Sequence, residues 1–205
     1  MIENHEESRP QSGLSSADVL YEAVAEGGIT RFLALYYCNS AETVGPVRSA
    51  RTYFLDFISE YGTSPLYVHV GGANQPGPAD ALSQIEDYGW VGINDMNQFS
   101  IGFPTFWRDY DRLGHPVATE HTMYSTTEKL LQFAVTKRKL AVEDEDGASW
   151  TKGFIPYSFK EDAPAEKRPA AQNVHLEFWT KAPEYAIDWI YEPAANIYKR
   201  SNVGK

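Results

Sequence analysis

The spacing of apolar side chains changes several times along the first 140 residues. In residues 16–28 apolar positions recur three, four and seven residues apart, as on one buried face of a helix: Ala17, Leu20, Tyr21 and Val24. Ser15 or Ser16 can cap such a helix, and Gly27 with Gly28 can end it. The pattern therefore predicts a helix over residues 16–28, preceded by an irregular lead-in over residues 1–16.

Residues 29–38, ITRFLALYYC, are rich in branched and aromatic side chains, which predicts a buried strand. A turn-forming stretch, GPVRSAR at 45–51, follows after a short polar loop. Helical spacing then returns over residues 50–61, at Ala50, Tyr53, Phe54, Phe57, Ile58 and Tyr61. We expect an amphipathic helix here that begins beside Ser49 and ends at Gly62.

Strand and helix patterns continue to alternate down to residue 140. PLYVHVGG at 65–72 and VGIND at 91–95 predict strands, while residues 78–89 and 126–140 predict helices. Alternation of this kind is typical of parallel strand pairing. The predicted fold class is therefore α/β, a layered sheet with flanking helices.

Beyond residue 140 the pattern becomes different. A charged, proline-bearing segment at 160–170 leads into VHLEFW at 174–179, AIDWIYE at 186–192 and NIYKR at 196–200. These read as short antiparallel strands. We therefore predict an α/β domain over 1–140 and a smaller, partial C-terminal β-rich domain over 141–205.

Composition narrows the classes of partner. The net charge of -10 and the pI of about 4.9 argue against nonspecific binding to nucleic acid or to an anionic membrane surface. No apolar run approaches the ~20 residues that a membrane-spanning helix needs. The single cysteine, Cys38, excludes an internal disulfide, and its apolar surroundings in the sequence predict a buried thiol.

The two arginines of GPVRSAR raise the main functional question. If Ser49 caps the following helix, Arg48 and Arg51 lie beside free backbone N–H groups and could clamp a phosphate or carboxylate. Arg31, in the preceding strand, would join them. The alternative is structural, because Glu22 and Glu26 lie one helical turn apart in the predicted helix and could pair with the same arginines.

Three histidines are candidates for chemistry. His69 ends the predicted strand YVH just before Gly71 and Gly72, at the sheet edge where α/β proteins bind ligands. His121 precedes the last helix and lies close to Tyr124. His5 follows Asn4 in the lead-in. His69 or His121 could act as a general base, although a hydrogen-bonded structural role fits either.

Known catalytic and metal motifs are absent from the sequence. It contains no HExxH, no GxSxG, no GxGxxG, and no lysine in the glycine-rich stretch GGANQPG at 71–77. The aromatic stretch FPTFWRDY at 103–110 could line a pocket or pack in the core. We expect neither a metal site nor a cofactor.

A succession of motifs resembles the YerB-like lipoprotein family, bacterial cell-envelope proteins with a domain of unknown function. The motifs are RPQSGLSSADVLYEAVAEGGITRFLALYY, GPVRSARTYFLDF, YVHVGG and HTMYSTTEKL, and they cover roughly residues 1–140. The tail resembles the start of the family's smaller C-terminal domain. Residues that fall in these motifs are Asn4, His5, Arg9, Glu22, Glu26, Arg31, Arg48, Ser49, Arg51, His69, His121 and Tyr124.

The resemblance implies an exported, membrane-tethered, two-part α/β protein, and it implies no activity. It also implies that this chain is shortened at both ends, lacking an export signal and a lipid-bearing cysteine, so that a membrane would be reached only through an anchor absent here. One departure is that the family often shows Pro-His-Asn-x-Tyr where this chain has Glu-His-Thr-Met-Tyr around His121.

Three functions remain open. The first is an extracytoplasmic module that binds an anionic small molecule or cell-wall fragment in a crevice lined by Arg31, Arg48, Ser49, Arg51, His69, His121 and Tyr124, supported by Asn4, His5, Glu22 and Glu26. The second is a hydrolase or transferase that uses His69 or His121 as general base in the same crevice. The third is a noncatalytic protein-interaction module whose aromatic tail, with Trp179, Trp189 and Tyr191, contacts a partner.

Overall fold

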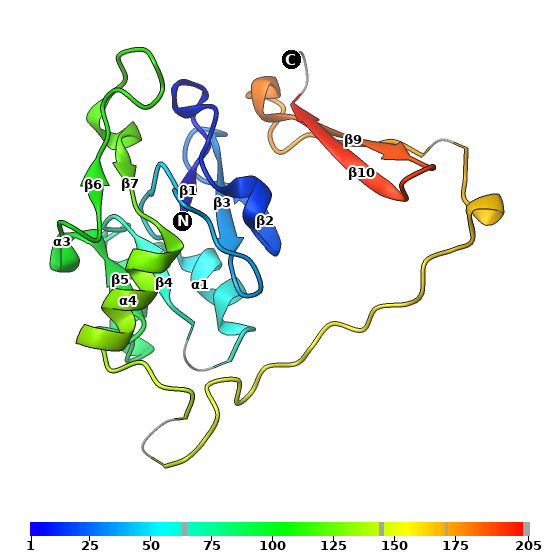
Figure 1. Ribbon diagram of the computed structural model, residues 1–205. Helices are drawn as coiled ribbons and strands as arrows, with labels where there is room; N and C mark the ends of the chain where they lie inside the picture. The colour runs from blue at the N-terminus through cyan, green and yellow to red at the C-terminus, as the bar shows by residue number, and fades with distance from the viewer. Residues whose placement is uncertain (63–64, 144–145, 171, 203–205) are drawn as a thin grey trace. The chain divides into compact units, whose positions relative to one another are not determined.

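The computed structural model describes residues 1–62, 65–143, 146–170 and 172–202 and contains two compact units (Figure 1). The first unit comprises Met1–Glu22 and Arg31–Ile155, and the second comprises Ala23–Thr30 and Pro156–Lys205. Helices and strands mix in the first unit, and the second is built mainly of antiparallel strands, which confirms the α/β class. The domain boundary near residue 140 stays a prediction.

A three-stranded sheet in the order β1-β3-β2 joins the beginning of the chain to its first long strands. β1 (Ile2–Glu3) pairs antiparallel with β3 (Thr30–Leu35), with Ile2 opposite Phe32 and Glu3 opposite Arg31. Ile2 and Phe32 are 3% and 2% exposed, so this sheet carries part of the core. The expectation of an irregular lead-in was wrong for β1, because two residues are too few to show a period.

The helix predicted over 16–28 was also wrong, because residues Val19–Val24 form strand β2 beside β3. Ser16 ends a 3-10 turn, η2 (Leu14–Ser16), and Gly27 and Gly28 turn the chain with φ of 63° and 87°. Val19, Tyr21 and Val24 are branched or aromatic residues that suit a strand, and pairing with β3 overrides the helical spacing. A Cβ at Gly28 would lie 2.6 Å from Ala182 Cβ, so this tip is closely packed.

Residues 44–50 form an extended segment that bridges several parts of the first unit. Isolated bridges join Val44 to Ser125, Val47 to Ile2 and Ala50 to Gly72. Because of these bridges, helix α1 starts only at Thr52 and runs to Ser59, with Arg51 as its N-cap. The prediction that Ser49 caps this helix was therefore wrong, whereas Phe54, Leu55 and Ile58 form its buried face.

Parallel pairing is found for one pair of strands among the described residues. The strand predicted at 91–95 was wrong in position, because residues 91–94 form a turn and the strand begins at Asp95. β4 (Tyr67–His69) runs parallel to β5 (Asp95–Asn97), with His69 opposite Asn97. Helix α2 (Ala81–Asp87) lies between these strands in the sequence and contacts α1. The short helix α3 (Gln98–Ile101) follows β5 directly. Because β4 and β5 are parallel, their carboxyl ends lie at the same edge of the sheet.

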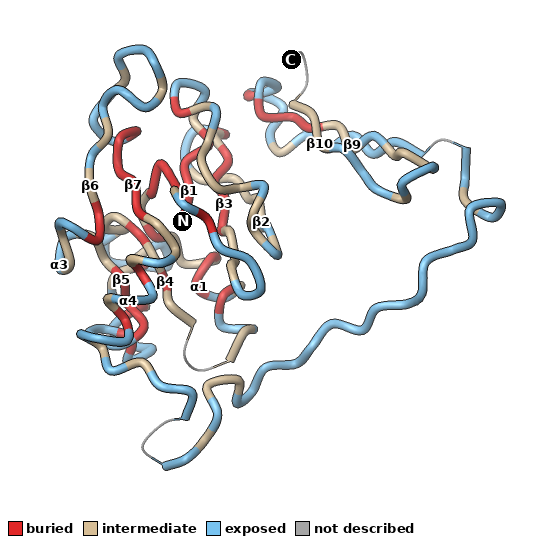
Figure 2. Tube along the Cα trace, in the orientation of Figure 1, coloured by how far each residue is buried: buried red, intermediate tan, exposed pale blue. Residues whose placement is uncertain are grey.

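The last part of the first unit contains β6 (Trp107–Arg108), paired antiparallel with β7 (Met123–Tyr124), and helix α4 (Thr127–Lys137). Short 3-10 helices lie at η1 (Glu6–Ser8) and η3 (Thr119–His121). Buried segments gather around β1, β3, β4 and β7 (Figure 2). One core cluster contains Ala41, Val44, Val47, Met96, Phe106, Met123 and Leu130.

The second unit confirms the predicted antiparallel tail. β9 (Ile187–Glu192) pairs with β8 (Val174–Leu176) on one side and with β10 (Ile197–Asn202) on the other. The 3-10 turn η4 (Ala165–Lys167) precedes these strands, and a second one, η5 (Pro183–Tyr185), lies between β8 and β9. No helix among the described residues is long and apolar enough to span a membrane.

Cys38 corrects another expectation, since its thiol is exposed rather than buried. β3 ends at Leu35, and residues 37–39 turn outward around the Asp18 carboxylate. Asp18 accepts hydrogen bonds from the backbone N–H groups of Tyr37 and Cys38 at 2.6 and 2.9 Å. This turn carries the thiol out of the apolar run that predicted its burial.

Candidate functional site

A cleft of about 480 Å³ lies where β4 and β5 end. Its size falls within the range of small-molecule sites. It is bounded by the extended segment, by the loops after both parallel strands, and by β6 and η3. The lining residues are Val47, Arg48, Ser49, Val70, Gly71, Gly72, Asn74, Leu82, Asn97, Phe99, Arg108, Thr119, Glu120 and Met123.

The cleft combines an apolar wall with a few polar groups. Gly71 and Gly72 allow the wall to close, since added Cβ atoms would lie 3.0 Å from Phe99 and 2.8 Å from Leu82. Asn97 accepts hydrogen bonds at Oδ1 from the N–H groups of Gly71 and Phe99 at 3.1 and 3.2 Å. Its side chain is therefore held in place beside the glycine pair.

Arg48 connects this cleft to a buried carboxylate. Its Nε donates to Glu3 Oε2, and Glu3 Oε1 also accepts from the backbone N–H of His5 at 3.3 Å. The Glu3 side chain is 3% exposed, compared with 27% for Arg48. Arg48 thus does bind one of the protein's own carboxylates, but this is Glu3 and not Glu22 or Glu26, the partners considered from the sequence.

Arg108 is the second arginine of the cleft, and from the sequence alone it was noted only as part of the aromatic stretch FPTFWRDY. It is exposed, and its Nη1 donates to Thr119 O at 2.6 Å and to Thr122 Oγ1 at 3.1 Å. Across the part of the chain that the structure describes, its Nε and Nη2 have no hydrogen-bond partner. One edge of this guanidinium is therefore fixed and the other is open to a ligand.

Glu120 limits the charge of the cleft. The pKa of its carboxyl is lowered, mainly by a hydrogen bond from its own backbone N–H and further by the nearby His121 and Arg48. Glu120 is therefore ionised at neutral pH, so it faces the same cleft as a negative charge. An anion would be accommodated on the side of Arg108 and away from this carboxylate.

His69 is buried at 0% exposure and has both ring nitrogens engaged. Nδ1 lies 2.7 Å from Gly71 O, and Nε2 lies 2.5 Å from Asp95 Oδ1. Because a carbonyl oxygen only accepts, Nδ1 must carry a proton. The ring thus joins β4 to β5 and to the loop that follows β4, and it does not line the cleft.

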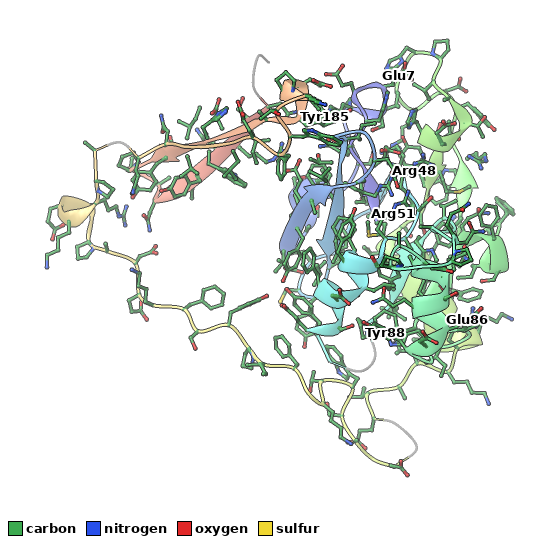
Figure 3. All side chains as sticks on the ribbon, turned by 180° about the vertical axis from the view of Figure 1, so that it is seen from behind. Glu7, Arg48, Arg51, Glu86, Tyr88 and Tyr185 are labelled. Atoms are coloured by element: carbon green, nitrogen blue, oxygen red, sulfur yellow. The ribbon has the colours of Figure 1, made fainter. Side chains whose placement is uncertain are left out.

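His121 belongs to a separate polar cluster beside the cleft. Its side chain is 6% exposed, and its ring stacks on that of His5 with centroids 4.9 Å apart. Burial lowers the pKa of His121, while Glu3 acts in the opposite direction. Its Nδ1 lies 3.7 Å from Glu3 Oε2, and its Nε2 lies 3.9 Å from Glu7 Oε2. Glu7 is labelled in Figure 3.

Two other predicted arginines contact the backbone of the extended segment. Arg31 is 2% exposed and its Nη1 donates to Ser49 O at 3.1 Å. Arg51 donates through Nη1 to Ala50 O at 2.6 Å (Figure 3). Of the predicted ligand-binding residues, Arg48 and Ser49 line the cleft and these two arginines stand outside its lining.

The supporting residues divide between the two units. Asn4 Nδ2 donates to Glu22 Oε1 at 3.2 Å, and Asn4 Oδ1 accepts from Arg9 Nε at 3.1 Å. Glu26 belongs to the second unit.

Tyr124, the last of the predicted binding residues, is fully buried under the guanidinium of Arg112, which lies 5.3 Å from the ring centroid. The proposed set of seven binding residues therefore remains a prediction, with its members in different surroundings.

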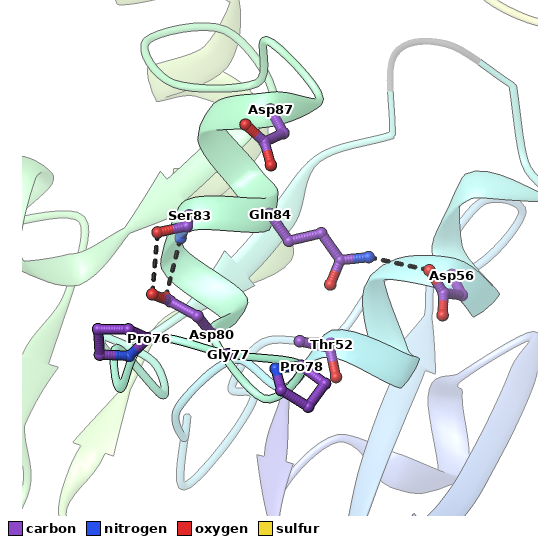
Figure 4. A pocket seen from close by; sticks show the side chains of 9 residues that line it. All are labelled: Thr52, Asp56, Pro76, Gly77, Pro78, Asp80, Ser83, Gln84 and Asp87. Atoms are coloured by element: carbon purple, nitrogen blue, oxygen red, sulfur yellow. Dashed lines mark hydrogen bonds between the residues drawn. The ribbon is translucent and has the colours of Figure 1, made fainter.

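A larger hollow of about 560 Å³ lies between α1 and α2 (Figure 4). Its charged lining residues are Asp56, Asp80 and Asp87. Asp80 caps α2 by accepting from Ser83 N at 3.1 Å, and Asp56 accepts from Gln84 Nε2 at 2.9 Å. Three carboxylates and no cation make this hollow unsuited to an anionic ligand, despite its greater size.

Comparisons with known proteins give a consistent picture. Residues 1–141 match the profile of a family described as "Protein of unknown function (DUF3048) N-terminal domain". The chain is 33% identical over 208 residues to the protein of Bacillus subtilis (strain 168) named "Putative lipoprotein YerB", covering 100% of this chain and 54% of that protein. The crystal structure of YerB from Bacillus subtilis is similar with a TM-score of 0.71 and 30% identity, covering 99% of this chain and 59% of that one.

Proposed function

Since this chain belongs to the DUF3048 family of YerB-like proteins of unknown function, we propose that it is an extracytoplasmic ligand-binding module that holds an anionic small molecule or cell-wall fragment. The cleft at the ends of β4 and β5 is the proposed binding site. The chain spans about half the length of the relative that it matches, so the proposal concerns this part alone.

The half-engaged guanidinium of Arg108 is the observation that carries the proposal. Hydrogen bonds from Nη1 fix the group against η3, and Nε and Nη2 remain available at the cleft. A carboxylate or phosphate accepts two parallel bonds from such a fork. Because the guanidinium is already ordered by its protein contacts, little side-chain entropy would be lost on binding.

The apolar wall indicates the other half of the ligand. Val70, Leu82 and Phe99 face the same cleft as the two arginines. Phe99 is 75% exposed, so its ring is accessible to a ligand in the cleft. A ligand with one acidic group and an apolar or sugar-like body would match this lining.

The extracytoplasmic part of the proposal rests on the relative, which is named a lipoprotein. Catalysis has less support. His69 has both ring nitrogens engaged, and His121 lies in a buried cluster outside the cleft lining, so neither histidine has the open access that a general base needs.

Titration with small anions followed by amide NMR tests this proposal. The probes are inorganic sulfate, inorganic phosphate and carboxylated or phosphorylated sugars. We expect shifts at Gly71, Gly72 and Asn97, and we expect Arg108→Gln to weaken binding by about tenfold or more, as for loss of a hydrogen bond to a charged group.

Arg112→Gln is the matched control, because it removes the same charge from an arginine that contacts Ser12 and Tyr124 outside the cleft. It should leave the affinity within about twofold of the wild type. The proposal is overturned if Arg108→Gln binds the probes as tightly as Arg112→Gln does, or if the shifts map away from the cleft.

A further inference from the structure

Side chains from two segments that are distant in the sequence meet beside the cleft. His5 and Glu7 belong to the turn at η1, and His121 ends η3. One possible ligand atom from each lies within 4.8 Å of the other two. We propose that His5, Glu7 and His121 form a binding site for a divalent transition-metal cation of the zinc class.

The donor set has the chemistry of such a site. Two imidazoles and one carboxylate are common ligands of zinc and of neighbouring first-row metals. With metal–ligand bonds of about 2.1 Å, tetrahedral geometry places ligand atoms about 3.4 Å apart. The 3.9 Å between His121 Nε2 and Glu7 Oε2 needs only a small contraction. The Glu7 side chain is 60% exposed and can make that adjustment.

The present contacts leave His121 unsatisfied. Among the described residues its buried Nδ1 has no hydrogen-bond partner, and its ring nitrogens lie 3.7 and 3.9 Å from the carboxylates of Glu3 and Glu7. These distances are too long for hydrogen bonds. The unsatisfied Nδ1 faces Glu3, so an ion held by His5, Glu7 and His121 would lie on the other side of the ring, where Nε2 approaches Glu7 at 3.9 Å.

His5 is positioned in a compatible way. Its ring stacks on that of His121 with an interplanar angle of 18°, so the two imidazoles are neighbours and one ring must turn about its side-chain bonds for both lone pairs to point at one ion. Its Nδ1 accepts from the backbone N–H of Glu7 at 3.3 Å. A nitrogen that accepts a hydrogen bond carries a lone pair. Because this hydrogen bond is long and therefore weak, the lone pair could bind a metal ion in its place.

Glu3 supplies the support that metal-binding histidines usually have. Its carboxylate lies behind His121 Nδ1 and is held by Arg48 and by the N–H of His5. Closing the 3.7 Å between Nδ1 and this carboxylate to a hydrogen bond would orient the imidazole and strengthen it as a ligand. Counting Glu3 and Glu7 against Arg48, the cluster also carries an excess of negative charge, which favours a cation.

The test is calorimetric titration of chelator-treated protein with ZnCl₂, together with Co²⁺ absorption spectra as a readout of coordination. We expect one ion per chain, a higher melting temperature with metal, and visible Co²⁺ bands. His5→Gln and Glu7→Gln should each weaken affinity by at least about tenfold. Both positions are partly or fully exposed, so these variants should fold.

Glu6→Gln is the matched control, since Glu6 is an exposed neighbour in the same turn. His175→Gln is a second control, because His175 lies beside Glu177 and Asp188 in the other unit. Neither should change the affinity. The proposal is overturned if no ion binds with a stoichiometry of one, if His5→Gln and Glu7→Gln bind as the wild type does, or if His175→Gln removes the binding.

Discussion

The pair formed by Arg48 and Glu3 makes the most direct prediction about stability. We consider Arg48→Met, which keeps the length of the side chain and removes the charge. The Glu3 carboxylate is 3% exposed and would then lie in the interior without the guanidinium that binds it. Breaking a buried ion pair from one side costs about 3–5 kcal/mol.

Two features of the structure lower that figure. The Arg48 side chain is 27% exposed, so the pair is only partly shielded from water. Glu3 also keeps the hydrogen bond from the N–H of His5 at 3.3 Å. We therefore expect Arg48→Met to lower the free energy of unfolding by about 2–4 kcal/mol. Glu3→Gln should cost less, about 1–2 kcal/mol, because the guanidinium that it leaves can still reach water.

The double variant separates the pair from its surroundings. With both charges removed, no buried carboxylate is left alone, so the two single costs should not add. We expect a coupling energy of about 1–3 kcal/mol between the positions. Urea unfolding followed by tryptophan fluorescence measures all four proteins, and Trp90, which is 7% exposed, reports on the first unit. Costs that add within about 0.5 kcal/mol would refute the reasoning.

Two further predictions concern a glycine and a surface histidine. Gly45 has φ of 149°, and an added Cβ would lie 2.6 Å from Tyr124 Cδ1 and 2.8 Å from Met123 O. Gly45→Ala should therefore destabilise the protein by about 1–3 kcal/mol, measured by thermal unfolding. An unchanged melting temperature would contradict this close contact. The pKa of His175 is raised, mainly by its hydrogen bond to Asp188 at 2.7 Å. The pair's stabilising effect is complete below the unfolded-state pKa of His175 and is lost as pH rises through the raised folded-state pKa. An NMR titration should show this pKa falling in Asp188→Asn, and an identical titration in both proteins would exclude the pair as its cause.

Local patterns were reliable where an element is long or has one clear buried face. The strand within 29–38, the helix within 126–140 and the three strands of the tail were all predicted, because branched, aromatic or periodic residues dominate them. Residues 16–28 misled because Ala17, Leu20, Tyr21 and Val24 follow a helical period and do not alternate, although the segment forms strand β2. Strand pairing with β3 decided between the two, and pairing is not written in local spacing.

The candidate sites depended on contacts that no local pattern contains. The partner of Arg48 is Glu3, which lies in a strand of two residues and 45 positions away. Arg108 was visible only as part of an aromatic stretch, and its half-engaged guanidinium depends on the loop that returns at Thr119. His5 and His121 likewise meet only in the folded chain. The resemblance to a family pointed to many of these residues without indicating which of them touch.

The bridges along residues 44–50 have a consequence for how this protein can change during evolution. Val44, Val47 and Ala50 are each registered against a different neighbour, so inserting or deleting one residue would turn Arg48 and Ser49 away from the cleft and disturb several sheets together. Under the proposed function, this segment can therefore change the ligand preference only through exchange of its side chains. The loop at 73–79 is exposed from Asn74 onward and reaches the cleft through Asn74, so it is free to vary in length. The proposed function thus predicts that relatives with different ligands differ in the length of that loop and keep the length of the segment that carries Arg48.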